Sequence, residues 1–352
     1  MIQTYDIGAT YCENYDCGPN FDGVSRIRVP DTPMKEFLGL PVRSRIGIAA
    51  GLLLNSKWIV GYAERGFDIL TYKTVRSGYR PCYDPPNWVF VDDEGRDAGP
   101  VYAVDTPEAD PTKVSSAVCF GMPSMAPEDW RSDVATAKSS LLEGQILVVS
   151  VVATPEAGAS REAVAEDFAQ CAEWALEAGA DVIEANFSCP NVCTPEGTIY
   201  QDAKLSRFIA GQIRSRIGAA RLLLKVGYFP GKKTLESFMI ELNNVVDGIT
   251  LVNGVSRPVL HRDGRPVFGE DYVQAGVLGR SIHQPSIANV RQAAAIRDQH
   301  ELELAILAVG GVSRVEDMQD FYQSGADAVM LGSSPMYLPQ LAAEAKRLHP
   351  DW

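Results

Sequence analysis

Residues 181–193 read Asp-Val-Ile-Glu-Ala-Asn-Phe-Ser-Cys-Pro-Asn-Val-Cys. The first half, from Val182 to Ala185, is an apolar run of the kind that forms a buried strand. The second half brings two carboxamides, a hydroxyl and a thiol to the point where this strand ends. Because parallel α/β folds place their chemistry at the carboxyl ends of strands, the junction indicates a functional site. The alternative is a strand followed by an Asx-type turn, with Cys189 as a small buried residue.

The composition indicates a globular protein that does not bind polyanions. Of the 352 residues 46% are hydrophobic, which is enough for a large core, and the net charge is −13. This charge argues against a nucleic-acid partner or an anionic membrane surface. Any small anionic ligand must therefore be held by local cations.

The cysteines and the N-terminus predict a soluble cytoplasmic protein. Seven cysteines in irregular positions favour a reducing compartment over a disulfide framework, and no spacing among them makes a metal site. Residues 1–8 have neither the basic nor the apolar region of a signal peptide. No apolar run approaches the roughly 20 residues that a membrane span needs.

Eight apolar segments alternate with helical patterns along the chain. We expect strands at 46–50, 69–73, 146–152, 181–186, 222–226, 248–252, 304–309 and 328–331. Their continuous apolar character suggests strands that are buried on both faces, as in a parallel sheet. Eight such units in a chain of this length predict an α/β fold, a closed (β/α)₈ TIM barrel.

The remaining segments are predicted to be additions to one barrel domain spanning residues 1–352. Residues 1–40 form an N-terminal extension, of which 1–33 is expected to be extended or to form a hairpin. Two long insertions, 76–124 and 254–284, are rich in Pro or Gly and are expected at the C-terminal face. Excursions of this length in a compact domain usually serve function.

Two glycine turns predict a phosphate site. Gly310-Gly311 follows the seventh strand and Gly332-Ser333 follows the eighth. In TIM barrels this is the usual place where backbone amides and a short helix meet a phosphate. The alternative is that the glycines only allow tight turns between strand and helix.

Two lysines at strand ends indicate an electron-rich ligand. Lys225 is the only charge within the apolar run 222–226, and Lys73 ends the second strand. A lysine is costly to bury without an anionic partner, although either side chain could also reach solvent. The pyrimidine edge of a flavin, which becomes negative on reduction, is one suitable partner.

At this point the residues show a family resemblance. Asn186-Phe-Ser-Cys-Pro-Asn191 resembles the Asn-x-Ser-Cys-Pro-Asn signature of class 1 dihydroorotate dehydrogenases. The resemblance covers roughly residues 40–340 and continues through Ala49-Ala-Gly51, Tyr72-Lys-Thr74, Leu224-Lys-Val226, Ser286-Ile-Ala-Asn-Val-Arg291, Val309-Gly-Gly-Val-Ser313 and Gly325-Ala-Asp-Ala-Val-Met-Leu-Gly332. Members of that family are FMN-containing (β/α)₈ barrels in which dimers are common, so the resemblance implies FMN and a homodimer.

The resemblance also implies a role for each matching residue. Cys189 would be the catalytic base that takes a proton from a substrate carbon while hydride passes to flavin N5. The implied cofactor contacts are Ala50, Gly51, Lys73, Thr74, Asn186, Lys225, Asn253, Gly279, Gly310, Gly311, Gly332 and Ser333. The implied substrate contacts are Lys73, Val118, Asn186, Asn191, Ser256 and Arg257.

The substrate contacts depart from the family pattern at two positions. The family motif Asn-Ser-Met-Gly-Leu-Pro-Asn is matched here by residues 118–124, and Val118 replaces its first Asn. A second family Asn, after the sixth strand, is replaced by Ser256, which precedes Arg257. Arg257 is either a bidentate carboxylate ligand or a surface residue. The loss of two hydrogen-bonding partners is expected to alter substrate choice.

The sequence therefore predicts an FMN-dependent oxidoreductase acting on a small-molecule substrate. It would interconvert a carbon–carbon single and double bond next to a carbonyl, with an unidentified electron partner. The alternatives are dihydroorotate dehydrogenase proper, in pyrimidine biosynthesis, a related dihydropyrimidine reduction, and an inactive flavin-binding protein. A non-redox lyase or isomerase with a phosphate-binding barrel is a further alternative.

We predict that Cys189→Ser abolishes most turnover with the true substrate, because a serine hydroxyl is a far weaker proton acceptor than a thiolate. The measurement is the steady-state rate with the substrate that reduces the wild-type flavin. Full turnover in Cys189→Ser would show that another group takes the proton.

Overall fold

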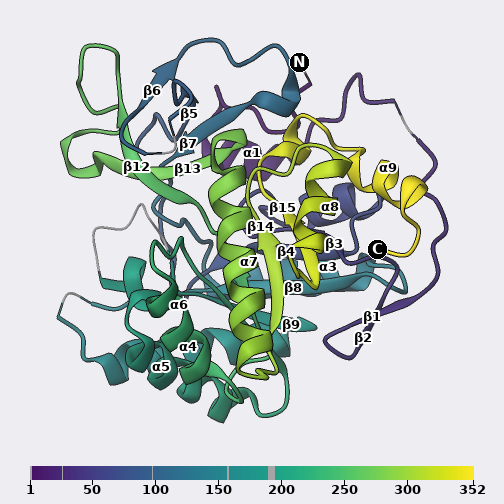
Figure 1. Cartoon of the computed structure of the whole chain (residues 1–352), viewed down its shortest axis with the longest axis vertical. Helices are drawn as coiled ribbons and strands as arrows, with labels where there is room; N and C mark the ends of the chain where they lie inside the picture. The colour runs from purple at the N-terminus through teal and green to yellow at the C-terminus, as the bar shows by residue number, and fades with distance from the viewer. Residues whose placement is uncertain (1, 26, 97, 157, 189–194) are drawn as a thin grey trace.

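The computed structural model shows a closed barrel of eight parallel strands surrounded by helices (Figure 1). It describes residues 2–25, 27–96, 98–156, 158–188 and 195–352. The barrel strands are β3 (Ile46–Ile48), β4 (Ile69–Val75), β8 (Ile146–Val151), β9 (Val182–Asn186), β10 (Arg221–Lys225), β11 (Gly248–Leu251), β14 (Ala305–Val309) and β15 (Ala328–Leu331). Each pairs with the next in this order, and β15 pairs with β3 to close the ring. The predicted TIM barrel is confirmed.

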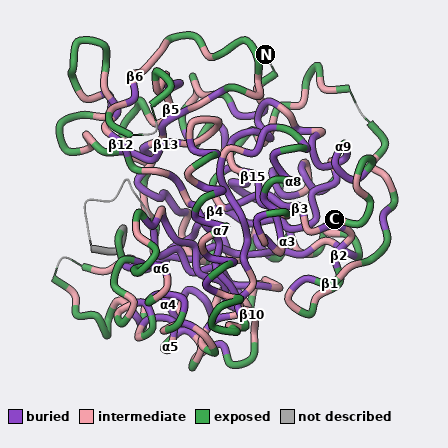
Figure 2. Tube along the Cα trace, in the orientation of Figure 1, coloured by how far each residue is buried: buried purple, intermediate pink, exposed green. Residues whose placement is uncertain are grey.

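The helices follow the strands because apolar residues recur at helical spacing after each strand. In α4 (Arg161–Glu177) the side chains of Phe168, Cys171 and Ala175 are buried, and Ser160 caps the helix by accepting from the Ala163 amide at 3.2 Å. The other barrel helices are α2 (Ser56–Ala63), α3 (Pro127–Ser140), α5 (Ala203–Ile217), α6 (Lys232–Leu242), α7 (His283–Gln299), α8 (Val315–Gln323) and α9 (Leu341–Leu348). Buried residues concentrate in the strands and on the inner faces of these helices (Figure 2).

A short hairpin closes the bottom of the barrel, where the strands begin. Strands β1 (Lys35–Phe37) and β2 (Leu40–Val42) pair antiparallel, and Phe37 and Val42 are buried against the barrel interior. Nearby, Lys346 of α9 and Asp68 form an ion pair at 2.6 Å with both side chains almost fully buried. Burial raises the pKa of Asp68 even though Lys346 faces it.

The N-terminal segment differs from the prediction of an extended chain or a hairpin. Residues Tyr11–Cys17 form a helix, α1. Thr10 and Glu13 make a reciprocal capping box at its start, in which the Thr10 hydroxyl accepts from the Glu13 amide at 3.2 Å and Glu13 accepts from the Thr10 amide at 2.7 Å. The Thr-x-x-Glu signature of a capping box is present in the sequence, but the Gly and Asn residues around it favoured the prediction of a non-helical segment.

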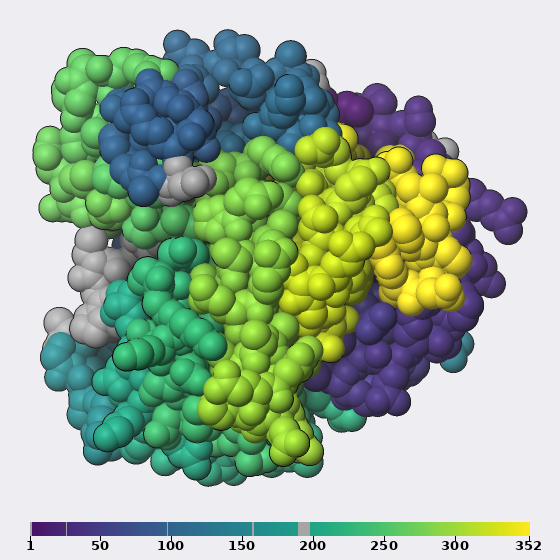
Figure 3. All heavy atoms as spheres, in the orientation of Figure 1, coloured from purple at the N-terminus to yellow at the C-terminus, as the bar shows by residue number. Residues whose placement is uncertain are grey.

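The two insertions combine into a second sheet above the mouth of the barrel. Its strands are β5 (Trp88–Asp92), β6 (Val101–Val104), β7 (Ser115–Val118), β12 (Val255–Leu260) and β13 (Gln274–Gly279). Antiparallel pairing of β7 with β13 and parallel pairing of β6 with β12 join segments that are far apart in the sequence. Figure 3 shows the corresponding blue and light green surfaces lying together at one corner of the molecule. The assignment of both segments as insertions on one domain stays a prediction.

The described helices include none with both the length and the apolar character needed to cross a bilayer.

We predict that Lys346→Met lowers the free energy of unfolding by about 3 kcal/mol, because it leaves a carboxyl group buried without its partner. Chemical denaturation of the purified protein measures this change. Arg265→Ala is the control, since its pair with Asp263 is exposed and its loss should leave stability unchanged within error. Equal stability of all three proteins would contradict a structural role for the buried pair.

Candidate active site

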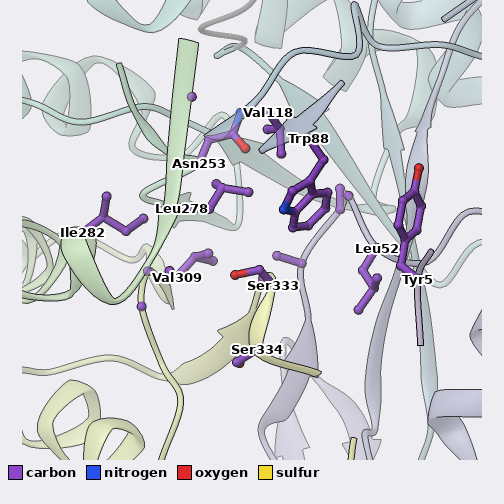
Figure 4. Close-up of a pocket in the computed structure, with 18 of the residues that line it drawn as sticks. Tyr5, Leu52, Trp88, Val118, Asn253, Leu278, Ile282, Val309, Ser333 and Ser334 are labelled. Atoms are coloured by element: carbon purple, nitrogen blue, oxygen red, sulfur yellow. The ribbon is translucent and has the colours of Figure 1, made fainter. Parts of the chain in front are cut away.

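A cavity lies at the carboxyl ends of the strands, between the barrel mouth and the second sheet. The space that protein atoms leave empty there is about 1370 Å³, which includes open solvent at its entrance. Lining residues come from the ends of β3, β4, β9, β10, β11, β14 and β15, from the second sheet and from the N-terminal segment. Figure 4 shows labelled side chains of the N-terminal segment, barrel and second sheet converging on this space.

Glycines form one pole of the cavity. Five of the predicted cofactor contacts line it: Gly279, Gly310, Gly311, Gly332 and Ser333. A Cβ at Gly310, where φ is +140°, would lie 2.0 Å from the Ser286 hydroxyl, so packing and backbone both require glycine there. A Cβ at Gly332 would meet no protein atom within 4 Å, so its absence leaves room on the cavity side. We call this glycine-lined pole the cradle.

Arg280 also lines the cradle, and the sequence analysis missed it. Its Nη1 donates to Asp317 Oδ1 at 2.8 Å, while Asp317 Oδ2 accepts from the backbone amides of Ser313 and Arg314 at 2.9 and 3.0 Å. Burial alone raises the pKa of Asp317, but the hydrogen bonds from Ser313 and Arg280 hold it below its usual value. The carboxylate is therefore charged and fixes the guanidinium beside the cradle. The only sequence signal for this role is the position of Arg280 directly after Gly279.

One group of side chains near the cradle has metal-ligating atoms close together. Ligand atoms of His283, Asp317 and Asp320 lie within 4.8 Å of one another. His283 Nδ1 lies 3.1 Å from the Gly310 carbonyl oxygen, and Asp317 is already paired with Arg280. The group therefore supports the cradle through these contacts, and the sequence prediction of no metal stays a prediction.

A second group of lining residues is polar and connected by hydrogen bonds. Lys225, almost fully buried, donates to the Ala50 carbonyl oxygen at 2.8 Å. Asn186 Oδ1 accepts from the Ser188 amide at 3.1 Å, and its Nδ2 lies 3.5 Å from Thr74 Oγ1. Two further predicted contacts, Lys73 and Asn253, complete this polar floor. Asn253 donates to the Ser188 carbonyl oxygen, and Lys73 and Asn253 both line the cavity beside Gly51, another predicted cofactor contact.

The charge of the lining is opposite to that of the whole chain. Lys73, Lys225 and Arg280 line the cavity, and no Asp or Glu does so among the residues that the structure describes. In a chain of net charge −13, this arrangement favours an anionic or electron-rich ligand.

The two altered substrate positions lie in one row across the second sheet. Val118 pairs with Gly276, and Gly276 pairs with Ser256, so the three positions share a face. Val118 and Gly276 line the cavity, whereas Ser256 is exposed and lies outside the lining. Arg257 is also outside the lining. Its guanidinium is buried and donates to the Gly99 carbonyl oxygen at 2.8 Å.

The burial of Arg257 corrects the alternative that it is a surface residue. Its role as a carboxylate ligand stays a prediction. The predicted contacts of Cys189 and Asn191 fall outside the described residues, so both remain predictions.

The sequence analysis also missed the apolar side of the cavity. Tyr5, Tyr11 and Trp88 line it. No motif could have assigned the tyrosines, because their position depends on how the N-terminal segment packs across the barrel mouth.

The fold and the position of the site together define a class of protein, the TIM-barrel enzymes whose active site lies at the carboxyl ends of the strands. Comparison with known proteins then identifies the family. The family model described as "Dihydroorotate dehydrogenase" matches residues 128–345. The chain belongs to the dihydroorotate dehydrogenase family, and the resemblance found in its sequence is confirmed.

Individual relatives agree with this assignment. The chain is 32% identical to a dihydroorotate dehydrogenase of Dictyostelium discoideum over 354 residues, covering 96% of this chain and 95% of the relative. It is 30% identical over 167 residues to the catalytic subunit of dihydroorotate dehydrogenase B (NAD(+)) of Thermotoga petrophila, covering 46% of this chain and 56% of the relative. The corresponding subunit of Methanocaldococcus jannaschii is 26% identical over 179 residues, covering 49% and 53%.

Family membership settles the reaction class. The protein is a flavin-dependent oxidoreductase that acts on CH–CH groups. This decides against the non-redox lyase or isomerase considered from the glycine turns alone.

Proposed function

We propose that the protein uses FMN to interconvert a carbon–carbon single and double bond next to a carbonyl in a small cyclic amide. Oxidation of dihydroorotate is the first reaction to test, because the relatives named above carry that activity in their names. The observation that carries the proposal is the cavity itself. Its lining combines a glycine cradle and an arginine with two lysines and two carboxamides.

The described residues fit FMN. The open space beside Gly332 allows a ligand to approach the backbone closely, as a phosphate at a glycine turn does. Gly279, Gly310, Gly311 and Ser333 would complete that contact, with Arg280 supplying the positive charge. The space that a flavin ring would take is lined by Ala50, Gly51, Thr74 and Asn253.

When bound, FMN supplies a two-electron acceptor or donor at its N5 atom. The chain contributes electrostatics and orientation. Lys225 is held in place by the Ala50 carbonyl, so its charge stabilises negative charge on an electron-rich ring beside it without a costly rearrangement. Asn186 is held by Thr74 and Ser188, so its carboxamide is oriented before a substrate binds.

The proton is assigned to Cys189 from the sequence. In the oxidation direction one carbon–hydrogen bond of the substrate loses its hydrogen as a proton to the Cys189 thiolate. The neighbouring carbon–hydrogen bond would lose its hydrogen as hydride, which bound FMN would accept with its two electrons, and the electron pair left on the first carbon would form the double bond. The homodimer and the cytoplasmic location stay predictions from the sequence.

We expect the purified protein to be yellow and to bind about one FMN per chain. Anaerobic addition of dihydroorotate should bleach the flavin absorbance, since no other acceptor is present. A colourless protein that takes up no FMN would contradict the proposed cofactor. A yellow protein that dihydroorotate leaves oxidised, but another cyclic amide reduces, would retain the reaction type and replace the substrate.

We further predict that Arg280→Met raises the FMN dissociation constant about 10- to 100-fold, the effect of losing a charge-assisted contact with phosphate. Riboflavin, which lacks the phosphate, should bind with the same affinity to wild type and variant. Titration of intrinsic flavin fluorescence measures both ligands.

Arg314→Met is the matched control, because Arg314 is exposed and lies outside the cavity lining. Equal weakening of FMN and riboflavin by Arg280→Met would show that Arg280 acts only through its ion pair with Asp317.

A further inference from the structure

Four aromatic residues form a connected wall on one side of the cavity. Tyr5, Tyr11, Trp88 and Phe120 all line it. The ring centroid of Tyr5 lies 5.7 Å from Trp88 and 6.4 Å from Phe120, and that of Phe120 lies 6.2 Å from Tyr11. These separations are those of packed aromatic pairs. We call these four residues the aromatic wall.

The second sheet extends the aromatic wall with apolar surface. Trp88 pairs with Val118, and Val118 pairs with Gly276, so a ring, a branched alkyl group and a glycine form the row that faces the cavity. In Figure 4 the side chains of Val118 and Trp88 lie together, with those of Leu52 and Tyr5 on the far side of the indole.

The aromatic wall is also electrically neutral and packed in place. Burial raises the pKa of Tyr5 and of Tyr11 well above the usual value, so both phenols keep their protons at neutral pH. Tyr5 additionally packs on Trp58, and both tyrosines are buried. The wall is therefore a preformed apolar surface, which a ligand covers without ordering mobile side chains.

The cavity lining thus has two kinds of surface. Lys73, Asn186 and Asn253 offer charge and hydrogen bonds, which suits the amide edge of a ring. Val118 and the ring faces of the aromatic wall offer neither, because the polar atoms of the wall are confined to two phenol hydroxyls and the buried Trp88 Nε1. An ionised substituent placed against Val118 and these ring faces would lose its hydration without meeting an opposite charge, whereas an alkyl or aryl group would gain by leaving water.

We propose that the substrate is a cyclic amide that carries an alkyl or aryl substituent, and that the aromatic wall together with Val118 selects this substituent. The inference rests on the proposed function and narrows its substrate class. The ring amides would face the polar floor, and the substituent would pack against Trp88 and Val118. Val118 and Trp88 are then specificity-determining residues, distinct from the residues that hold the cofactor.

The test is a binding series with the FMN-loaded full-length protein. The ligands are uracil, orotate, and uracils that carry a methyl or benzyl group at carbon 5 or carbon 6. Each is titrated while the absorbance spectrum of the bound flavin is recorded, because this spectrum responds to a ligand placed against the ring. We expect at least one benzyl-substituted uracil to bind 10-fold or more tightly than both uracil and orotate.

Val118→Asn places a carboxamide in the apolar row and should reverse this order. The benzyl ligand should weaken at least 10-fold and orotate should tighten, with FMN affinity unchanged. Val255→Asn is the matched control, because Val255 belongs to the same sheet but is offset by one residue from the Ser256–Gly276–Val118 row and does not line the cavity. It should leave the ratio of benzyl-ligand to orotate affinity as in wild type.

The outcomes distinguish failure of the apolar-substituent inference from failure of the proposed function. Uptake of FMN with equal or tighter binding of orotate in the wild type overturns the apolar-substituent inference alone. That inference is also overturned if Val118→Asn binds FMN normally and leaves the ligand order unchanged. Failure of the wild type to take up FMN overturns the proposed cofactor and the inference with it.

Discussion

Closure of eight parallel strands into one ring is the constraint on which the rest of this molecule depends. Once β15 pairs with β3, every strand ends at the same rim, and residues that are remote in sequence become neighbours. Lys73 and Lys225 meet in one cavity although more than a hundred residues separate them. The barrel interior is filled by its own side chains, and the hairpin β1–β2 covers its lower end. The cavity that holds the predicted site residues therefore lies at the upper rim.

The electrostatics of that rim follow from desolvation. A lysine in the position of Lys225 can stay charged only if nearby dipoles or a ligand replace its lost hydration, and the Ala50 carbonyl supplies part of this. At the cradle, Asp317 likewise compensates Arg280 for its lost hydration. Keeping carboxylates out of the described lining preserves this positive field inside a strongly acidic protein. An anionic cofactor would then complete the charge balance of the site.

The second sheet gives the site a separate structural layer. Barrel strand ends supply the polar floor and most of the cradle, while the two insertions supply Gly279 of the cradle and the row of Trp88, Val118 and Gly276. The two layers belong to different hydrogen-bonded ladders. The same layering places Arg257 outside the cavity lining, where it ties the loop at Gly99 to the sheet.

Local pattern was sufficient for the barrel and for much of the candidate site. Each buried strand reads as an apolar run, and the cradle glycines are visible because tight strand-to-helix turns demand that residue. Lysines at strand ends were recognisable by the cost of burying them. Tertiary structure alone decided the rest, because pairing between distant segments leaves no local trace. It joined 76–124 to 254–284 in one sheet, brought Tyr5 and Tyr11 to the cavity, placed Arg280 at the cradle and tied Arg257 to the loop at Gly99.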